Sequence, residues 1–264
     1  MLVPVAKVVA VANQKGGVAK TTTVQALGVA LAQGGRRVLL VDLDPQASLT
    51  FSLGYDPDAL DVSLHDVLVR RQKIADVRLP VDGVDGLSLV PASIDLAGAE
   101  VHLLQRTGRE HVLARALEPE LGDHDIVLID CPPSLGVLTI NGLTAAQAVL
   151  IPLQCEALSQ RGVGQLLETI DDVRAFANAE LRVLGVVATM YDGRTRHSRQ
   201  VLDEVHSRFG LTVFEPPVPR SVRFAEAPEQ GRSILQHAPN SPGAAAYRAL
   251  AERLTEALAY NAAS

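Results

Sequence analysis

The chain has 264 residues, of which 47% are hydrophobic and 20% charged, so it has enough apolar material for a sizeable core and too little charge for a disordered chain. Its formal net charge of -6 argues against binding of nucleic acid by the whole surface, because phosphate contacts need a local excess of Lys and Arg. Any contact with DNA must therefore be confined to a patch. Aromatic residues make up only 3%, so Val, Leu, Ala and Ile must build the core, as in a buried parallel sheet covered by helices.

The first residues and the cysteines favour a cytoplasmic protein without stable membrane association. Residues 2–12 are apolar but interrupted by Pro4 and Lys7, and they run into a glycine loop, which predicts a strand rather than a signal peptide. No stretch reaches the ~18 uninterrupted apolar residues that a membrane helix needs. Cys131 and Cys155 lack the C-x-x-C spacing of a zinc or redox pair, so we expect buried, reduced thiols.

Short apolar runs alternate with helical stretches along the chain. Continuous apolar runs of this length are typical of strands that are buried on both faces. The predicted strands are residues 7–12, 38–41, 87–90, 126–129, 148–153 and 183–190. The predicted helices are residues 21–33, 63–71, 94–105, 109–121, 159–178, 199–209 and 242–260.

This alternation predicts an α/β fold, a three-layer α/β/α sandwich in which crossovers build a mainly parallel, twisted sheet. Ligands of such sheets bind at the carboxyl ends of the strands, so the loops after strands are the candidate functional segments. We find no internal repeat, linker or low-complexity segment. Residues 75–85 and 214–238, rich in Pro and Gly, are interpreted as surface excursions of a single domain that spans residues 1–264.

The strongest motif is the segment 13–22 (NQKGGVAKTT), between the first predicted strand and the first long helix. Phosphate binding needs main-chain N–H groups that point inward and free amides at a helix N-terminus, and a loop of small residues supplies both. Lys20 would neutralise the β and γ phosphates, and the Thr21 hydroxyl would be a Mg²⁺ ligand. The strict G-x-x-x-x-G-K-[ST] pattern is not met, since Gln14 and Ala19 replace its two glycines.

Carboxylates follow two further predicted strands. Asp42 and Asp44 come after residues 38–41, and Asp130 ends the run 126–129 in the Walker B form. Asp130 can hold Mg²⁺ through its water shell, Asp42 is a second candidate for the metal, and Asp44 can reach the γ-phosphate to orient the attacking water. Each acid alone could be a strand-end cap or a loop residue. The three motifs in this order predict a Mg²⁺–ATP site and an ATPase.

These motifs resemble those of the ParA/Soj family of chromosome and plasmid partition ATPases, within the wider MinD-like group of deviant Walker P-loop NTPases. The likeness is carried by residues 15–22 (KGGVAKTT), 41–46 (VDLDPQ) and 128–134 (LIDCPPS), and it extends to residues 189–195 (TMYDGRT) and 218–228 (VPRSVRFAEAP). It therefore covers nearly the whole chain. Because no helix-turn-helix extension precedes the first predicted strand, we expect the short chromosomal type.

The resemblance implies a role for each matching residue. Lys15 would be the signature lysine that reaches across a nucleotide sandwich dimer to the partner's phosphates, where a second cation is useful mainly to charge that develops opposite it. Asp44 would position the hydrolytic water, and the loops after Asp44 and Asp130 would be switches that sense the γ-phosphate. The predicted catalytic residues are thus Lys15, Lys20 and Asp44. The predicted ATP-binding residues are Lys15, Gly16, Gly17, Val18, Ala19, Lys20, Thr21, Thr22 and Pro219, and the predicted metal-site residues are Thr21, Asp42 and Asp130.

The sequence departs from the family pattern at two positions. Ala19 stands where the family commonly has glycine, and an alanine there would be strained, with slow turnover, if the backbone needs a positive φ. Cys131 replaces the more usual Thr, which removes a hydroxyl next to the predicted metal ligand Asp130. Neither change removes a principal ligand.

Basic residues gather at two places in the C-terminal third and form the candidate DNA contacts. The resemblance implies non-specific DNA binding by the ATP dimer only, through arginines that match Arg194 and Arg223. One small patch neutralises few phosphates and a dimer doubles their number, so affinity should depend steeply on dimerisation and on salt. The alternative is a basic helix start that is merely solvated. The candidates are Arg194, Arg196, His197, Arg199, Arg220 and Arg223.

The function that follows is ATP-driven DNA partition, in which the ATP dimer coats the nucleoid and a ParB-type partner at centromere-like sites stimulates hydrolysis and release. A MinD-like ATPase on a membrane surface would need a basic amphipathic C-terminal helix, and residues 244–264 lack a lysine-rich apolar face. An electron-transfer protein similar to the nitrogenase iron protein would share a cluster through two cysteines per chain, a context that Cys131 and Cys155 do not match. A further alternative is an orphan ATPase that positions another cargo on the nucleoid. The sequence does not exclude it, because the sequence of such an ATPase does not identify its cargo.

Overall fold

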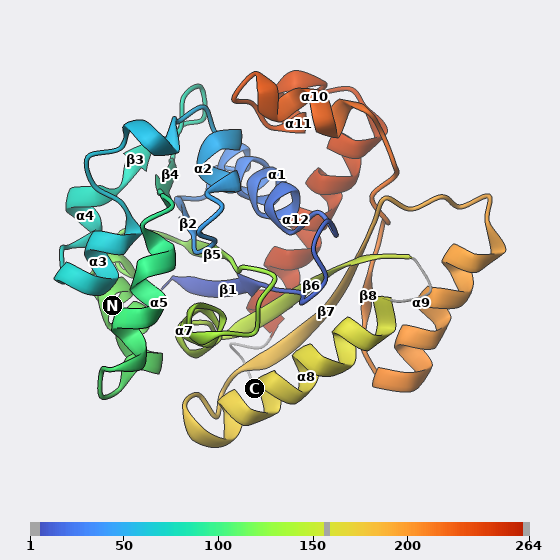
Figure 1. Ribbon diagram of the computed structural model, residues 1–264. Helices are drawn as coiled ribbons and strands as arrows, with labels where there is room; N and C mark the ends of the chain where they lie inside the picture. The colour runs from blue at the N-terminus through green and yellow to red at the C-terminus, as the bar shows by residue number, and fades with distance from the viewer. Residues whose placement is uncertain (1–5, 156–158, 261–264) are drawn as a thin grey trace.

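The computed structural model describes residues 6–155 and 159–260, apart from the side chains of residues 159–161, 196, 197 and 260, and it is a three-layer α/β/α sandwich (Figure 1). Within these residues the strands form one sheet in the order β3-β4-β2-β5-β1-β6-β7-β8, and every neighbouring pair is parallel except β3 with β4. The strands are β1 (Lys7–Val11), β2 (Val38–Asp42), β3 (Leu79–Pro80), β4 (Leu87–Val90), β5 (Ile126–Asp130), β6 (Ala148–Gln154), β7 (Arg182–Thr189) and β8 (Val213–Phe214).

Helices cover both faces of this sheet. One face is covered by α3 (Leu64–Arg70), α4 (Ile74–Val77), α5 (Leu96–Leu104), α6 (Val112–Leu117), α7 (Val137–Ala145), α8 (Ser159–Phe176) and α9 (Arg196–Phe209). The other face is covered by α1 (Lys20–Gln33), α2 (Ser48–Ser52), α11 (Ile234–His237) and α12 (Pro242–Tyr260), with α10 (Arg223–Glu229) beside α11. Short 3-10 turns lie at Pro57–Ala59, Arg109–His111 and Glu118–Glu120.

Successive side chains of one strand point into two different hydrophobic cores. In β2, Leu39 and Val41 belong to the core under α3 and α5, whereas Val38 and Leu40 belong to the core under α1 and α12. Because both faces of the strand are buried, every position is apolar and the run does not alternate. This explains why the central strands could be predicted from continuous apolar runs, and it confirms the predicted α/β sandwich.

Several elements differ from their sequence-based prediction. The sequence did not predict the strands β3 and β8, because two residues are too few to give an apolar run. It also did not predict α7, which begins after Gly136 without a side-chain cap. The predicted helix 109–121 is divided into α6 and two 3-10 turns. Residues 214–238 are more than a surface excursion, because they contain β8, α10 and α11, and α11 buries Ile234 and Leu235.

In the part of the chain that the structure describes, no helix combines the length and the hydropathy that crossing a membrane requires. The central strands β1, β2 and β5 end side by side, because they pair in parallel and in register. The three loops that carry the predicted nucleotide motifs therefore meet at one edge of the sheet (Figure 1).

Candidate nucleotide-binding site

The loop between β1 and α1 has the backbone of a phosphate cradle. Gly17 has φ 74° and Ala19, the N-cap of α1, has φ 63°. Asn13 holds the start of the loop, since its Oδ1 accepts from the Lys15 N–H at 3.0 Å and its Nδ2 donates to the Pro152 carbonyl at 2.8 Å. The first N–H groups of a helix have no intrahelical partner, and residues 19–22 at the start of α1 line the cavity at this edge of the sheet. The positive φ that would strain an alanine is therefore present at Ala19.

Lys20 reaches into the cradle from the first residue of α1. Its side chain is buried, and Nζ lies 3.4 Å from the Lys15 carbonyl oxygen. Burial lowers the pKa of the Lys20 ammonium, and the carboxylates of Asp130 and Asp44 act in the opposite direction. This buried cation lies near two acids and the main-chain amides of the loop. Such a site is suited to a polyanion, because a polyanion adds more negative charge around the cation than the two acids supply.

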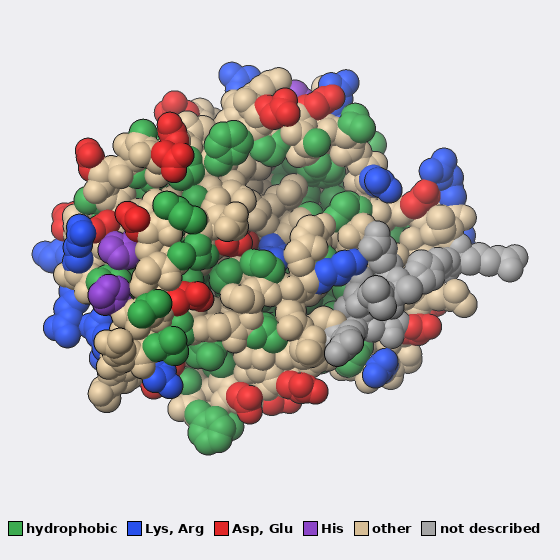
Figure 2. Space-filling model, viewed as in Figure 1, with side chains coloured by type: hydrophobic (Ala, Val, Ile, Leu, Met, Phe, Trp, Pro, Cys, Tyr) green, Lys and Arg blue, Asp and Glu red, His purple; other side chains and the backbone are tan. Residues whose placement is uncertain are grey.

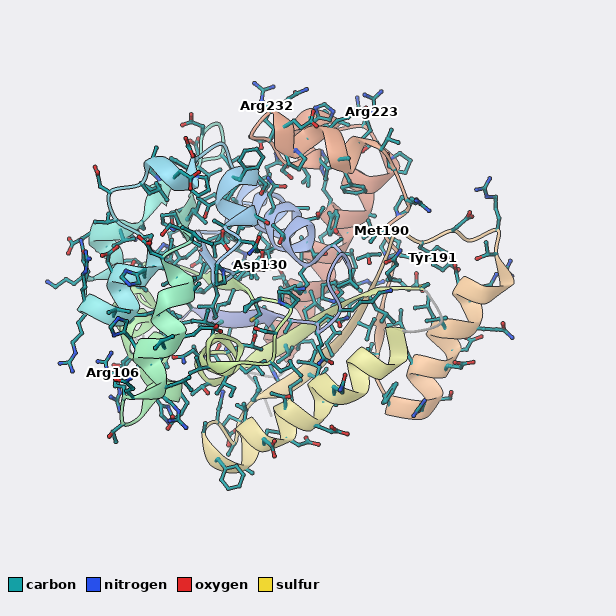
Figure 3. The ribbon with its side chains drawn as sticks, in the orientation of Figure 1. Arg106, Asp130, Met190, Tyr191, Arg223 and Arg232 are labelled. Carbon is teal, nitrogen blue, oxygen red and sulfur yellow. The ribbon has the colours of Figure 1, made fainter. Side chains whose placement is uncertain are left out.

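Asp130 at the end of β5 has the properties of a metal ligand. It is 1% exposed, and neither carboxylate oxygen has a hydrogen-bond partner among the described residues. Burial raises its pKa well above the usual value and the Asp42 carboxylate raises it further, while the Lys20 ammonium and the nearby Thr21 hydroxyl, which is close to Asp130 but not in hydrogen-bond geometry, oppose the shift. Two unpaired buried oxygens beside the Thr21 hydroxyl fit a hard divalent cation such as Mg²⁺. In Figure 3, Asp130 lies near the centre of the view, where the strand ends meet.

Asp42 is held differently from Asp130, although the two are register partners on β2 and β5. Its Oδ2 accepts from the Thr50 backbone N–H at 2.8 Å and from the Thr50 hydroxyl at 2.7 Å, and its Oδ1 accepts from the Asp44 N–H at 3.3 Å. Burial raises the pKa of Asp42 to about 7, against the effect of the Thr50 hydrogen bonds. Asp42 thus anchors the loop to α2, and its predicted role at the metal stays a prediction.

Asp44 faces Lys20 across a cavity of about 550 Å³ that Gly16, Gly17 and Thr21 also line. Its Oδ1 accepts from the Gln46 N–H at 3.0 Å, so the loop itself orients the carboxylate. Pro45 and Asp44 are only half-buried, as expected for a segment that responds to a ligand.

The phosphate cavity continues into an apolar compartment. A second cavity of about 370 Å³ shares Gly17, Ala19 and Thr22 with the first and is otherwise lined by β7-end and C-terminal residues, including the predicted Pro219. Tyr247 is fully buried there, with its hydroxyl 3.0 Å from Thr23 Oγ1 and its ring edge-on to Phe224 at 6.0 Å. An apolar compartment beside a phosphate cradle suits a nucleobase. Sequence reasoning missed Met190, Phe224 and Tyr247; the place of Met190 after β7 was a usable signal, whereas Tyr247 lies inside a helix that gave none.

The remaining residues of the predicted set lie at the edges of this site. Val18 is buried and its carbonyl accepts from the Thr189 hydroxyl at 3.0 Å, which joins the cradle to β7. Lys15 is half-buried and does not line the phosphate cavity, so it lies at the rim rather than inside. The structure thus brings together Gly16, Gly17, Ala19, Lys20, Thr21, Thr22, Asp44, Asp42 and Asp130, and places Lys15 and Pro219 at the borders.

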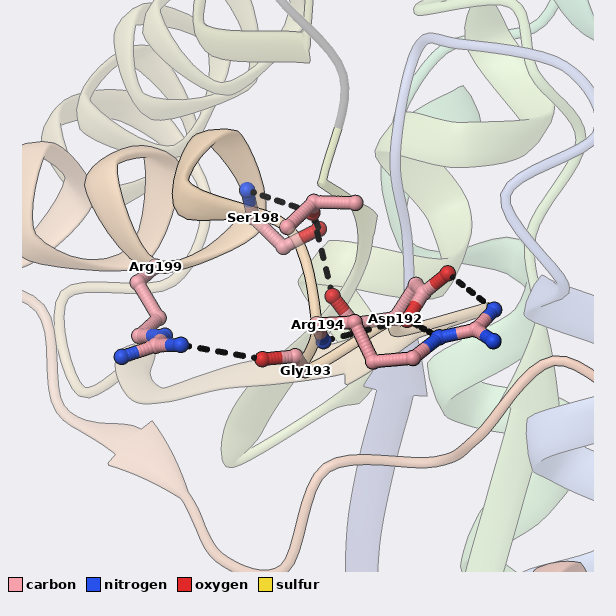
Figure 4. Close-up of polar contacts among 6 residues, drawn as sticks. Asp192, Gly193, Arg194, Ser198 and Arg199 are labelled. Carbon is pink, nitrogen blue, oxygen red and sulfur yellow. Dashed lines mark hydrogen bonds and ion pairs between the residues drawn. The ribbon is translucent and has the colours of Figure 1, made fainter.

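The candidate DNA contacts form two neighbouring segments. An isolated bridge between Tyr191 and Pro219 and the Arg220 N–H, 3.4 Å from the Tyr191 carbonyl oxygen, place the segment before α9 beside the segment before α10. Arg194 is 90% exposed and makes a bidentate pair with Asp192, at 2.9 Å from Nε and 2.8 Å from Nη2 (Figure 4). This pair lowers the pKa of Asp192 to about 2.

Arg199, Arg220 and Arg223 are also exposed. Arg199 donates to the Gly193 carbonyl at 3.2 Å, and Arg223 pairs with Glu226 at 2.9 Å (Figures 3 and 4). The side chains of Arg196 and His197 lie outside the described residues. The patch therefore exists as a surface, but Arg194 and Arg223 are already ion-paired.

A main-chain cradle at a helix N-terminus, a buried lysine and an unpaired carboxylate at a strand end define a P-loop nucleotide-binding protein. A family model described as an AAA domain matches residues 6–183. Soj of Bacillus subtilis strain 168 is 44% identical over 248 residues, which cover 94% of this chain and 98% of that protein. The Soj ATPase of Thermus thermophilus is 47% identical over 250 residues, 93% and 94% of the two chains. The chain belongs to the ParA/Soj family of P-loop ATPases.

Solved structures agree with this family and with its ligands. A structure of cobyrinic acid a,c-diamide synthase from Mycobacterium smegmatis, with an ATP analogue and magnesium bound, is 55% identical over 95% of both chains and has a TM-score of 0.85. MinD from Pyrococcus horikoshii with Mg-ADP is 25% identical, covers 94% of this chain and 96% of that one, and has a TM-score of 0.73. The protein is thus an ATPase that uses ATP and Mg²⁺.

Proposed function

We propose that this protein is an ATP-driven DNA-partition switch of one domain, which dimerises on ATP, binds DNA non-specifically as the dimer and responds to a ParB-type partner in the cytoplasm, on the nucleoid. The observation that carries the proposal is the cavity in which Asp44, on a half-buried loop, faces the buried Lys20. Two relatives are described as chromosome-partitioning proteins, ParA of Caulobacter vibrioides at 44% identity and the Soj ATPase of Thermus thermophilus at 47% identity, each with above 90% of both chains covered. A loop that holds the water-orienting acid and is anchored to its neighbours is what a nucleotide switch needs.

In this mechanism the amides of residues 16–21 and the Lys20 ammonium bind the phosphates, and Thr21 and Asp130 hold Mg²⁺. The metal, when bound, neutralises charge on the phosphate oxygens. Asp44 accepts a hydrogen bond from the attacking water and orients it toward the γ-phosphate. Thr50 keeps the Asp42 carboxylate, and with it the start of the Asp44 loop, in place through its two hydrogen bonds.

Dimerisation is proposed to complete the site. Lys15 lies at the rim of the phosphate cavity, from which a side chain can reach a nucleotide on a facing subunit but is not needed for its own. Charge that develops on the γ-phosphate during hydrolysis would be stabilised by such a cation only in the dimer. ATP binding and subunit pairing are then linked.

The proposed DNA surface consists of the segments before α9 and α10 together with the first residues of these two helices. Arg199 and Arg220 add positive charge beside the pairs Arg194–Asp192 and Arg223–Glu226. Because each pair offsets its own charge, one subunit offers few free cations, and binding should need both subunits and low salt. Helix α12 favours DNA rather than a membrane as the surface that this protein binds. Its apolar side, with Tyr247, Leu250 and Leu254, is buried in the core and cannot insert into a membrane.

The test is a salt-titrated DNA-binding assay with ADP, ATP and a slowly hydrolysed analogue. Arg194→Glu and Arg223→Glu should each lose DNA binding while Mg-ATP binding is kept. Arg253→Glu is the matched control, because Arg253 is exposed and pairs with Glu256 at the same i,i+3 spacing as Arg223 with Glu226. Undiminished DNA binding by both variants would place the surface elsewhere, and binding that ignores the nucleotide would contradict the switch.

The name of the M. smegmatis structure raises amide synthesis as a second candidate function. Amide synthesis needs a source of ammonia. If glutamine were that source, a reactive thiolate would be needed to attack its amide, and the chain has two cysteines. Cys131 and Cys155 are both buried, and burial raises the pKa of both thiols, that of Cys155 to about 11. Because such thiols are poor nucleophiles, they favour DNA partition over amide synthesis as the function. ATP turnover that rises with cobyrinic acid and glutamine, but not with DNA and a ParB-type protein of the same genome, would reverse this preference.

A further inference from the structure

The outer face of α5 carries an exposed apolar stripe. Ile94, just before the helix, is 61% exposed, Val101 is 61% exposed and Leu104 is 57% exposed, while Ala97 and Gly98 lie exposed between them. Spacings of three and four residues place these side chains on one side of the helix. The opposite side, with Leu96, Ala99 and Leu103, fills the core. The stripe, which we name the α5 face, is therefore apolar without contributing to the fold.

Small residues at the middle of the α5 face leave open space between its larger residues. A Cβ added at Gly98 would meet no atom within 4 Å, so the space above it is open. Large residues at both ends and small ones between them allow another helix to approach closely. Figure 2 shows hydrophobic side chains over this part of the molecule, with Lys, Arg and His side chains along the adjoining edge.

Uncompensated cations flank the α5 face on the side of α3. A cavity of about 340 Å³ between the two helices is lined by Arg71, His102 and Arg106, and a neighbouring cavity of about 670 Å³ shares both arginines and adds Lys73 and Arg115. Among the described residues, none forms an ion pair with Arg71, Lys73 or Arg115, and the Arg106 guanidinium donates only to the Leu68 carbonyl. In a chain of formal net charge -6, this concentration of free positive charge is a local property of one face.

The one acid that lines the larger cavity is already used. Glu120 pairs with Arg78 at 2.9 Å, so it does not neutralise the four cations around it. On the other flank of α5, Glu100 lies beside the loop after β5, where its Oε1 would be 3.3 Å from a Cβ at Gly136. The charge across the α5 face is consequently asymmetric, positive toward α3 and negative toward the loop.

We propose that the α5 face and its flanking cations dock an amphipathic helix of another protein, with its apolar side on Ile94, Val101 and Leu104 and acidic side chains toward Arg71 and Arg106. Apolar anchors give such a complex its affinity and the cations set its orientation. A second copy of this chain with its α5 packed antiparallel to the first fits less well, because that two-fold axis would bring the cations of both copies together. Duplex DNA would use the cations but gains nothing from the apolar stripe.

The probe is a synthetic peptide helix of about 14 residues, roughly 21 Å long, with leucines at i, i+3 and i+4 spacing and glutamates on one flank. A matched peptide carries lysine in place of each glutamate. Fluorescence anisotropy with the full chain and Mg-ATP should show that the acidic peptide binds and the basic one does not. Added salt should weaken the complex, since the flanking contacts are exposed.

Two variants and one control decide the outcome. Val101→Glu should weaken the acidic peptide at least about tenfold, because it removes buried apolar area and adds a like charge. Arg71→Glu should weaken it as well, and Phe176→Glu, which charges a side chain that is 87% exposed on α8, should not. Unchanged Mg-ATP binding shows that the variants are folded.

Four results would overturn the proposal. They are equal binding of the two peptides, binding by neither, unchanged affinity of Val101→Glu, and a loss confined to DNA binding in Arg71→Glu, which would make this face a nucleic-acid contact. A change in the ATP-dependent dimerisation of Val101→Glu, measured by sedimentation, would instead assign the face to the contact between two copies, and it too would overturn the proposal.

Discussion

Asp130 and Asp192 are both carboxylates at the carboxyl end of the same sheet, yet they are held in opposite ways. Asp130 is 1% exposed and its oxygens have no hydrogen-bond partner among the described residues. Asp192 is half-buried and accepts three hydrogen bonds from the exposed Arg194, two from its guanidinium and one from its backbone N–H. An unpaired buried charge is unfavourable until a ligand compensates it, whereas an exposed pair is screened by solvent and salt. Binding of Mg-ATP at the first region should therefore be nearly abolished when one buried charged group is removed. Binding of DNA at the second region should instead change gradually with salt and with each exposed charge.

The largest expected effect is at Lys20. Lys20→Ala removes the buried cation of the cradle and leaves Asp44, Asp130 and the phosphates without it. Because loss of one partner of a buried charge pair costs about 2–5 kcal/mol, affinity for Mg-ATP should fall by at least ~30-fold. Isothermal calorimetry measures this. Arg253→Ala, which removes an exposed and ion-paired cation, should leave the affinity unchanged. Tight nucleotide binding by the Lys20 variant would break the contrast between the two regions.

Asp44→Ala should separate binding from turnover. The residue is half-buried and its carboxylate is oriented by its own loop, so its removal should leave Mg-ATP binding and the fold intact. Without a group that orients the water, hydrolysis should slow by about 10²–10⁴-fold, and the protein should accumulate as an ATP dimer on DNA. Phosphate release and sedimentation report the two effects, and Asp61→Ala, at an exposed acid on the loop before α3, serves as the control. Normal turnover in the Asp44 variant would remove it from the water-orienting role.

Asp130→Asn is expected to have effects of opposite sign. The amide is isosteric with the carboxyl group, but it carries no charge to bury next to Asp42, so the nucleotide-free chain should become more stable by about 1 kcal/mol. Affinity for Mg-ATP should fall, and ATP binding should become insensitive to chelation of Mg²⁺. Urea unfolding and nucleotide titration with and without EDTA measure the two effects. Asp171→Asn, at an exposed acid paired with Arg174, should change neither, and a loss of stability at Asp130 would show that its carboxylate is satisfied by the protein itself.

The difference between the two regions also decides what the sequence can predict. The central strands and the motifs at their ends were predictable, because burial on both faces leaves apolar runs and a phosphate cradle needs small residues before a helix. The sequence does not distinguish Asp42 from Asp130, since both end an apolar strand. Only the position of Thr50, eight residues later, shows that one carboxylate is hydrogen-bonded and the other is not.

Tertiary contacts explain what sequence reasoning missed. Tyr247 reaches the second cavity because α12 packs on α1, a contact between residues 224 positions apart that no local pattern encodes. Arg194 and Arg223 could be selected as basic residues, but their ion pairs with Asp192 and Glu226 depend on side-chain geometry. The segment 214–238 was predicted as an excursion because it is rich in Pro and Gly, and its helices, only seven and four residues long, are too short to show a helical pattern in the sequence.

The smallest expected effect comes from the backbone of the cradle. Four non-glycine residues of the described chain have positive φ; Ala19 and Met190 line the second cavity, Ala47 follows Asp44, and Arg71 lies apart on α3. Ala19→Gly should raise the free energy of unfolding by about 0.5–1 kcal/mol, because glycine adopts φ 63° without strain. Arg71→Gly should give a similar gain with no change in ATP turnover, whereas turnover should rise in Ala19→Gly as the cradle adjusts more freely. Equal, unchanged turnover in both variants would show that strain at Ala19 is structural and leaves the chemistry of the site unaffected.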